Sequence, residues 1–103
     1  MSNRDYRHQC LDKTQARKLI SEIATHHPRG ISFSCHALEE LKNDDLTTVD
    51  ILNVVKSSDS RILREPDFEK GSYRYVLETR RMSVVIAFNG KNSFTVVTAW
   101  RKR

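Results

Sequence analysis

Three runs rich in aromatic and β-branched residues, all in the last third of the chain, place the strongest constraint on its fold. They cover residues 73–79, 82–88 and 93–100, and short polar breaks separate them. Residues of these types favour strands, and this spacing is typical of hairpins. The break between the last two runs contains Asn89-Gly90, which tolerates the positive φ of a tight turn. The sequence therefore predicts a three-stranded, twisted antiparallel meander.

Alternation along these runs separates a core face of the predicted sheet from a second face. The second face carries smaller and polar side chains, and Arg74 and Arg101 both fall on it. It is therefore a candidate docking surface for a polyanion, although ordinary surface arginines on a solvated face fit the same pattern. The larger side chains define the core face, which takes Tyr73, Tyr75, Leu77, Met82, Val84, Ile86, Phe88, Phe94, Val96, Thr98 and Trp100.

The residues before the meander predict three helices. Asp12 and Gln15 have the spacing of a capping box, apolar residues then recur on one helical face, and Pro28 ends the helix. Ser34 is the expected cap of a second helix and Thr47 of a third. Two further segments are candidates for short strands, residues 31–33 and 61–64.

Helices followed by antiparallel strands indicate an α+β fold. We expect the N-terminal helices to pack on one face of a twisted, mainly antiparallel sheet of four to five strands. The 103 residues suffice for one domain with one modest core. Within that domain we expect residues 1–30 to form a helical extension and residues 31–103 to form the helix-plus-sheet core.

Composition excludes several classes of protein. Hydrophobic residues make up 38% of the chain and charged residues 30%, which fits a folded, water-soluble domain. No apolar run approaches membrane-spanning length, so we expect no membrane partner. The first ten residues contain no hydrophobic region typical of a signal peptide. The two cysteines, Cys10 and Cys35, are too few for a disulfide framework, and reduced thiols suit a cytoplasmic location.

The net charge of +5 is unevenly distributed. Residues 1–30 carry six Lys or Arg against three Asp or Glu, whereas residues 31–60 carry two against six. Residues 61–103 carry ten against four, so the basic excess lies on the predicted sheet. This asymmetry favours a nucleic acid or an acidic protein as partner over a neutral small molecule.

Histidines and cysteines do not recur at metal-ligand spacing. His8 and Cys10 form one pair and Cys35 and His36 another, but neither C-x-x-C nor H-E-x-x-H is present. We therefore expect no metal site and no cofactor.

His36 and a set of basic side chains carry the best chemical signal. Cleavage of RNA without a metal requires proton removal from a hydroxyl, cationic support of the phosphate and proton return to the leaving oxygen. His36, in the first turn of a predicted helix, suits the proton transfers; the alternative is a histidine that only makes local hydrogen bonds. Guanidinium groups suit the phosphate. The candidate nucleic-acid-binding residues are Arg61, Arg64, Arg74, Arg81, Arg101 and Lys102.

The segment ISFSCHALEELKNDDLTTVDILNVV, followed by strands reading YRYVL, VVIAF and VVTAW, resembles the RelE/BrnT-like group of small toxins. The similarity covers about residues 31–100, and Ser34, His36 and Ala37 match its S-x-H-A motif. The resemblance implies a helix-plus-sheet fold and a metal-independent endoribonuclease that cleaves RNA, often on the ribosome. It also implies a cognate antitoxin protein as partner.

By match to the group's motifs, the resemblance implies His36, Arg74 and Thr98 as catalytic residues. The alternation places Thr98 on the core face, so its role is structural unless a bulge changes its direction. Two hypotheses stay open, and with them the question of whether the chain is an enzyme. One is the endoribonuclease. The other is a non-catalytic module of the same fold that docks nucleic acid or a protein.

Overall fold

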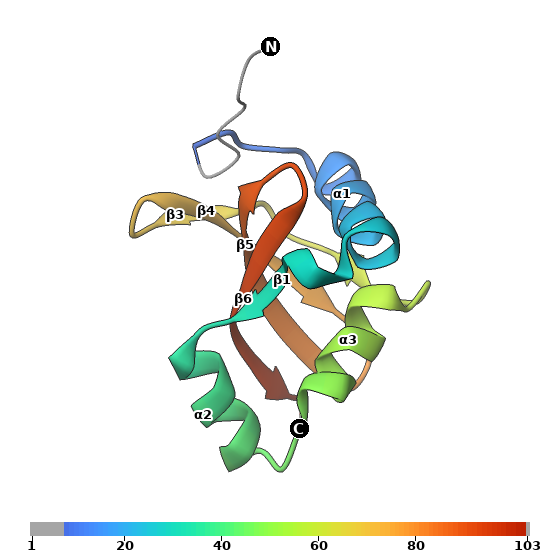
Figure 1. Ribbon diagram of the computed structural model, residues 1–103, viewed down its shortest axis with the longest axis vertical. Helices are drawn as coiled ribbons and strands as arrows, with labels where there is room; N and C mark the ends of the chain where they lie inside the picture. Colours follow the sequence, from blue (N-terminus) through green and yellow to red (C-terminus); the bar gives the residue numbers. More distant parts are fainter. Residues whose placement is uncertain (1–7, 103) are drawn as a thin grey trace.

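The computed structural model describes residues 8–102 and has the predicted α+β fold (Figure 1). N-terminal helices pack against a mixed, mainly antiparallel sheet of six strands. The helices are α1 (Lys13–His26), a 3₁₀ turn η1 (Pro28–Gly30), α2 (Cys35–Asn43) and α3 (Thr48–Lys56). The strands are β1 (Ile31–Phe33), β2 (Arg61–Ile62), β3 (Asp67–Glu69), β4 (Ser72–Glu78), β5 (Met82–Gly90) and β6 (Ser93–Arg101).

The strands follow the order β1-β6-β5-β4-β2, and β3 pairs separately with β4. Strand β1 runs parallel to β6, with Ile31 opposite Phe94, and the other pairs are antiparallel. The sixth strand, β3, is not among the strands that the sequence predicted. Lys70 and Gly71 have φ values of 49° and 84°, which suit a tight hairpin turn between β3 and β4.

The predicted helix caps are present at all three helices. Asp12 and Gln15 form a reciprocal capping box at α1, and Thr47 and Asp50 form one at α3. At α2 the Ser34 hydroxyl accepts a hydrogen bond from the backbone N–H of Ala37 at 3.0 Å. These bonds satisfy backbone groups that a helix leaves unpaired at its start, so local sequence fixes where each helix begins.

The core fills one face of the sheet, which helices α1 and α3 cover (Figure 1). Tyr75 is fully buried there, and its hydroxyl accepts a hydrogen bond from the Leu11 N–H at 2.9 Å. This bond joins the segment before α1 to the centre of the sheet. The largest fully buried side chains are Tyr75, Phe88, Phe94, Ile20, Ile23, Ile51, Leu77 and Ile86.

A β-bulge in β6 reverses the direction of the side chains that follow it. Val96 pairs with Ile86 and Thr98 pairs with Val85, so Val97 is an extra residue in β6. Beyond the bulge, Ala99 takes the core position and is fully buried. The predicted faces of the last residues of β6 are therefore wrong: Thr98 and Trp100 leave the core face, and Arg101 leaves the second face.

Ser34 fixes this bulge from the opposite side of the strand pair. Its backbone N–H donates to the Val96 carbonyl at 3.0 Å, and its hydroxyl donates to the Val97 carbonyl at 2.8 Å. The same hydroxyl caps α2, so one side chain couples the start of a helix to the register of the strand beside it.

We expect Ser34→Ala to lower the free energy of unfolding by about 2 kcal/mol, because it removes the cap and leaves the Val97 carbonyl without its partner. Thr47→Ala is the matched control, since it removes a cap with no bond to the sheet, and should cost about 1 kcal/mol. Urea unfolding of both variants measures the difference. Equal losses would show that the bond to Val97 contributes nothing.

Candidate nucleic-acid interface

The face of the sheet opposite the core, called here the open face, carries side chains in three rows set by strand register. In the first row, Arg74 lies beside Ala87, and Ala87 pairs with Thr95. The second row runs Val76, Val85 and Thr98, and the third runs Arg61, Glu78, Ser83 and Trp100. The open face thus has an apolar centre between two polar rows.

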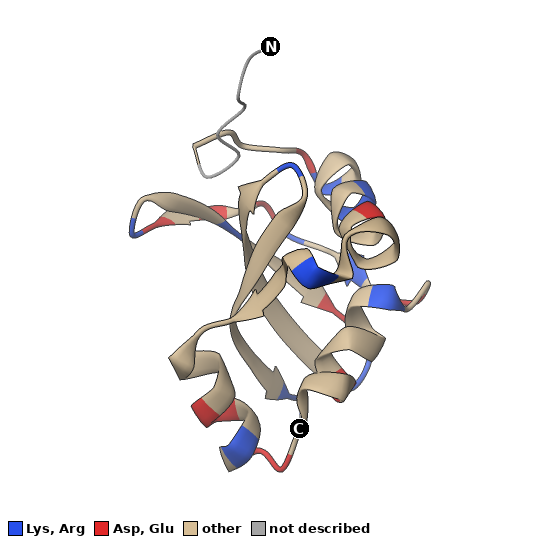
Figure 2. Cartoon of the chain, viewed as in Figure 1, with Lys and Arg blue, Asp and Glu red and all other residues tan. Residues whose placement is uncertain are grey.

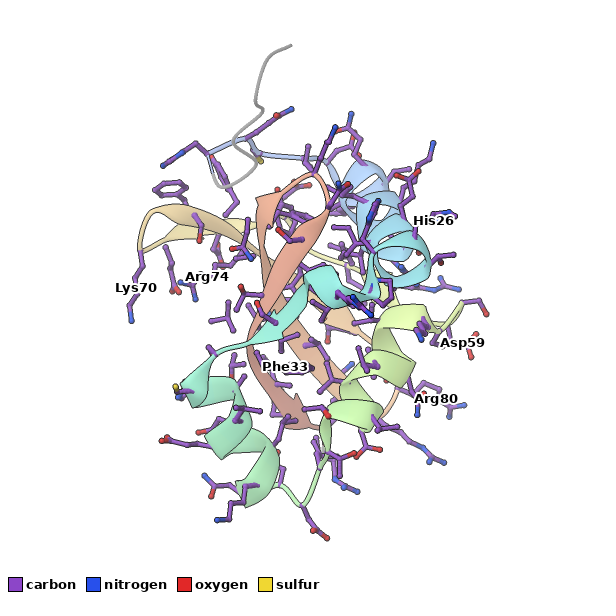
Figure 3. All side chains as sticks on the ribbon, in the orientation of Figure 1. His26, Phe33, Asp59, Lys70, Arg74 and Arg80 are labelled. Atoms are coloured by element: carbon purple, nitrogen blue, oxygen red, sulfur yellow. The ribbon has the colours of Figure 1, made fainter. Side chains whose placement is uncertain are left out.

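Arg74 lies low on the open face, with its side chain only 17% exposed. Its Nη1 atom is 4.0 Å from Glu69 Oε2, at the limit of an ion pair. Its Nε atom is buried and has no hydrogen-bond partner among the described residues. Figure 3 shows Arg74 near the β3–β4 hairpin, whose tip carries Lys70. An oxyanion that approaches the open face would meet the outer Nη atoms of this guanidinium, which the long contact with Glu69 leaves largely available.

Of the other two predicted catalytic residues, Thr98 lies on the open face and His36 lies on helix α2. Thr98 is half-buried on the open face, one row from Arg74, because of the bulge. His36 is the second residue of α2 and is exposed. Ser34, two residues earlier, contacts the carbonyl of Val97, which precedes Thr98. In the described part of the chain, no hydrogen bond or ion pair orients the His36 ring.

Three of the predicted nucleic-acid-binding residues come together in a cavity of about 760 Å³ at the end of the open face. Arg61, Arg81 and Lys102 line it with Arg80, against the carboxylates of Asp59 and Glu78. Figure 3 shows Arg80 and Asp59 on the same side of the molecule. We call this cavity the basic hollow. Its remaining lining residues are Ser57, Leu63 and Thr79.

Glu78, which the sequence pattern did not single out, is the most constrained carboxylate in the basic hollow. Its Oε1 atom accepts from Lys102 Nζ at 3.0 Å and from Ser83 Oγ at 3.3 Å. The hydrogen bond from Lys102 is the main cause that lowers the pKa of Glu78, and the charge of Arg64 adds to it. Glu78 is therefore ionised at neutral pH. The alternation along β4, which puts Glu78 on the same face as Arg74, could have identified it from the sequence.

Arg101 lies outside the open face. Its backbone N–H donates to Asp44 Oδ2 at 3.0 Å, and its Nη2 atom donates to the Asp44 carbonyl at 3.4 Å. A second cavity of about 530 Å³ lies beside it, lined by Glu40, Asp44, Trp100, Arg101 and Lys102. Figure 2 shows the acidic positions of α2 and of the turn that follows it. Arg101 thus contributes to a cavity of mixed charge.

Within residues 8–102, no group of three or more His, Cys, Asp or Glu side chains is placed to hold a metal ion. Cys10 and Cys35 are exposed and form no disulfide. Among the described helices, none has the length and apolar character needed to cross a membrane. Arg103, the last residue of the predicted basic tail, lies outside the described residues.

We expect Glu78→Gln to lower the free energy of unfolding by about 1 kcal/mol at pH 7, because it removes the ion pair with Lys102. Because the pKa of Glu78 is lower in the folded than in the unfolded protein, its ionised form adds to the free energy of unfolding at pH values above the unfolded pKa. This contribution is lost as the pH falls through the folded pKa. The difference from the parent protein should therefore shrink as the pH falls below about 4 and vanish only below the folded pKa. Urea unfolding from pH 7 to pH 3 measures it, with Glu39→Gln as control, because Glu39 is exposed and has no ion pair among the described residues. A difference independent of pH would contradict the assignment.

Comparison with known proteins gives one match. No curated protein and no solved structure matches the chain. A family model described as "Domain of unknown function (DUF4258)" matches residues 33–101. This segment runs from the end of β1 to the end of β6, and it includes the bulge, the three rows of the open face and most of the residues that line the two cavities. Because the match covers more than half of the sequence, the chain belongs to the DUF4258 family.

Proposed function

We propose that this chain binds RNA on the open face and cleaves it without a metal ion, as a toxin-type endoribonuclease related to the RelE/BrnT-like group. One observation carries the proposal: the bulge at Val97 turns Thr98 to the face that carries the guanidinium of Arg74, whose contact with Glu69 is a long one of 4.0 Å. The basic hollow at the end of this face supplies further positive charge for the RNA backbone.

Each residue has a distinct role in the proposed reaction. Arg74 binds the non-bridging oxygens of the scissile phosphate and stabilises the charge that develops there. The Thr98 hydroxyl donates a hydrogen bond to the same phosphate. His36 takes the proton of the attacking 2′-hydroxyl or returns one to the departing 5′-oxygen. Arg61, Arg64, Arg81 and Lys102 bind flanking phosphates. Arg101, held by Asp44 outside the open face, has no role in the proposed reaction.

The proposal includes partners and a location. The substrate is RNA, free or on the ribosome, and such an activity operates in the cytoplasm. A cognate antitoxin would silence the enzyme by covering the open face, whose half-buried Val76 and Val85 offer an apolar centre for a protein contact.

A second candidate function is a binding module without catalysis. It is favoured by the exposed His36, whose ring has no orienting partner within the described residues. General acid–base catalysis works best with a positioned side chain, whereas binding of RNA through its phosphates depends on total positive charge. The two functions therefore differ in their dependence on His36.

We expect the purified protein to cleave single-stranded RNA in the presence of a metal chelator. Arg74→Ala should lower the cleavage rate by about a hundredfold, as the loss of one oxyanion partner does in other enzymes. Lys70→Ala, which removes a cation at the tip of the neighbouring hairpin, is the matched control and should change the rate less than threefold. Gel analysis of a labelled RNA gives the rates, and thermal melts show that each variant folds.

The response of His36→Ala separates the two candidate functions. In the endoribonuclease, His36→Ala abolishes cleavage and leaves RNA affinity within a factor of two. Binding that weakens with salt, without cleavage by the parent protein, would reject the enzyme and support the module. Absence of both binding and cleavage would reject the endoribonuclease and the RNA-binding module, and would leave only a module that docks a protein.

A further inference from the structure

Trp100 lies on the open face, whereas the alternation in the sequence predicted the core face. It is the only tryptophan of the chain, and 37% of its surface is exposed. The bulge at Val97 places it in the third row, where it pairs with Ser83. An exposed indole is a platform on which a nucleobase can stack, and here it lies in a cavity lined by Glu40, Asp44, Arg101 and Lys102.

Ser83 shows that the third row is closely packed. It belongs to the open face, yet only 2% of it is exposed. Its neighbours across the sheet are Trp100 on one side and Glu78 on the other, and its hydroxyl donates to Glu78 Oε1 at 3.3 Å. The indole and the carboxylate are therefore attached two strand spacings apart, roughly 10 Å, with Ser83 between them.

Glu78 presents one oxygen that no described residue uses. Lys102 and Ser83 both donate to Oε1, whereas no described residue donates to Oε2. The ion pair keeps the pKa of Glu78 low and the group ionised, so the carboxylate can only accept hydrogen bonds. The Glu78 carboxylate, fixed beside the Trp100 indole, would favour a stacked base whose edge carries hydrogen-bond donors.

The cations around this row suit the phosphates of a bound nucleotide. Lys102 lines both cavities, the basic hollow on the side of Glu78 and the smaller cavity on the side of Trp100. Arg61 pairs across the sheet with Glu78, at the outer end of the same row. A base above Ser83 would therefore have cationic side chains near both of its flanking phosphates.

We propose that the third row is a nucleobase site for guanine in single-stranded RNA, in which Trp100 stacks on the base and Glu78 accepts from its Watson–Crick edge. Guanine presents two adjacent donors there, N1–H and the 2-amino group, and both can donate to Oε2, the Glu78 oxygen whose two lone pairs no described residue uses. Uracil, cytosine and adenine each present a single donor on that edge. The inference rests on the proposed RNA binding and is independent of cleavage.

The sole tryptophan makes the site directly measurable. The probes are 2′-O-methyl hexanucleotides, which lack the attacking hydroxyl and so stay intact: one of uridine alone, one with a single guanosine and one with inosine in its place. We expect the guanosine oligomer to quench Trp100 fluorescence and to bind about tenfold more tightly than the uridine oligomer. Inosine lacks the 2-amino group and should lose most of that preference.

Two variants with the same change of charge test the role of Glu78. Glu78→Gln should reduce the guanosine preference from about tenfold to less than twofold. Asp59→Asn removes a carboxylate from the same hollow but outside the third row, so it should keep the preference. Both variants remove one negative charge, so any general gain in RNA affinity is common to them.

The outcomes separate this inference from the proposed function. Binding without quenching of Trp100 would overturn the stacking, and equal affinity for the three oligomers would overturn the reading by Glu78; RNA binding itself would stand in both cases. An unchanged preference in Glu78→Gln would also overturn the inference. No binding to any oligomer would reject the RNA site and the proposed function together.

Discussion

The arrangement of the open face depends on the contact between Ser34 and the bulge at Val97. Without the extra residue, regular alternation would turn Thr98 and Trp100 into the core and Ala99 outward. The Ser34 hydroxyl, which caps α2, donates to the carbonyl of the extra residue at 2.8 Å. One hydroxyl group thus hydrogen-bonds both to the first turn of a helix and to the bulged strand, and this holds the bulge at one position.

Some charges of this protein form close pairs, and one end of the sheet carries a local excess of cations. Lys102 and Glu78 form a close ion pair at 3.0 Å, and Arg101 is held by Asp44. Arg61, Arg80 and Arg81 line the basic hollow with Lys102, where the carboxylates number fewer than the cations. Such a surface attracts polyanions at long range, and the fixed pair gives it one position at which hydrogen-bond geometry can discriminate.

The segment that matches the family contains most of the open face. The matching segment, residues 33–101, contains β4, β5 and β6 and both helices that join β1 to the rest of the sheet. Helix α1 lies before this segment and covers part of the core face. The open face, which carries both proposals, is formed within the matching segment except for the Lys102 side chain that follows it.

The sequence by itself determined the caps, the helices, the meander and therefore the α+β class, because these depend on contacts within a few residues. It did not reveal β3, since the charges of Asp67 and Glu69 and the preceding Pro66 mask the strand signal. Only the tertiary structure decided the face of Thr98, Trp100 and Arg101. The contact that sets it joins residues 63 positions apart, and no local pattern records it.

The candidate site shows the same division. Arg74 was placed correctly from alternation along β4, because β4 is regular there. Glu78 and Lys102, whose pairing distinguishes the basic hollow, meet only when β4, β5 and β6 are aligned. Sequence patterns therefore identified the chemistry-bearing residues strand by strand, whereas the register between strands decided which of them act together, because register is set by long-range pairing and by the bulge.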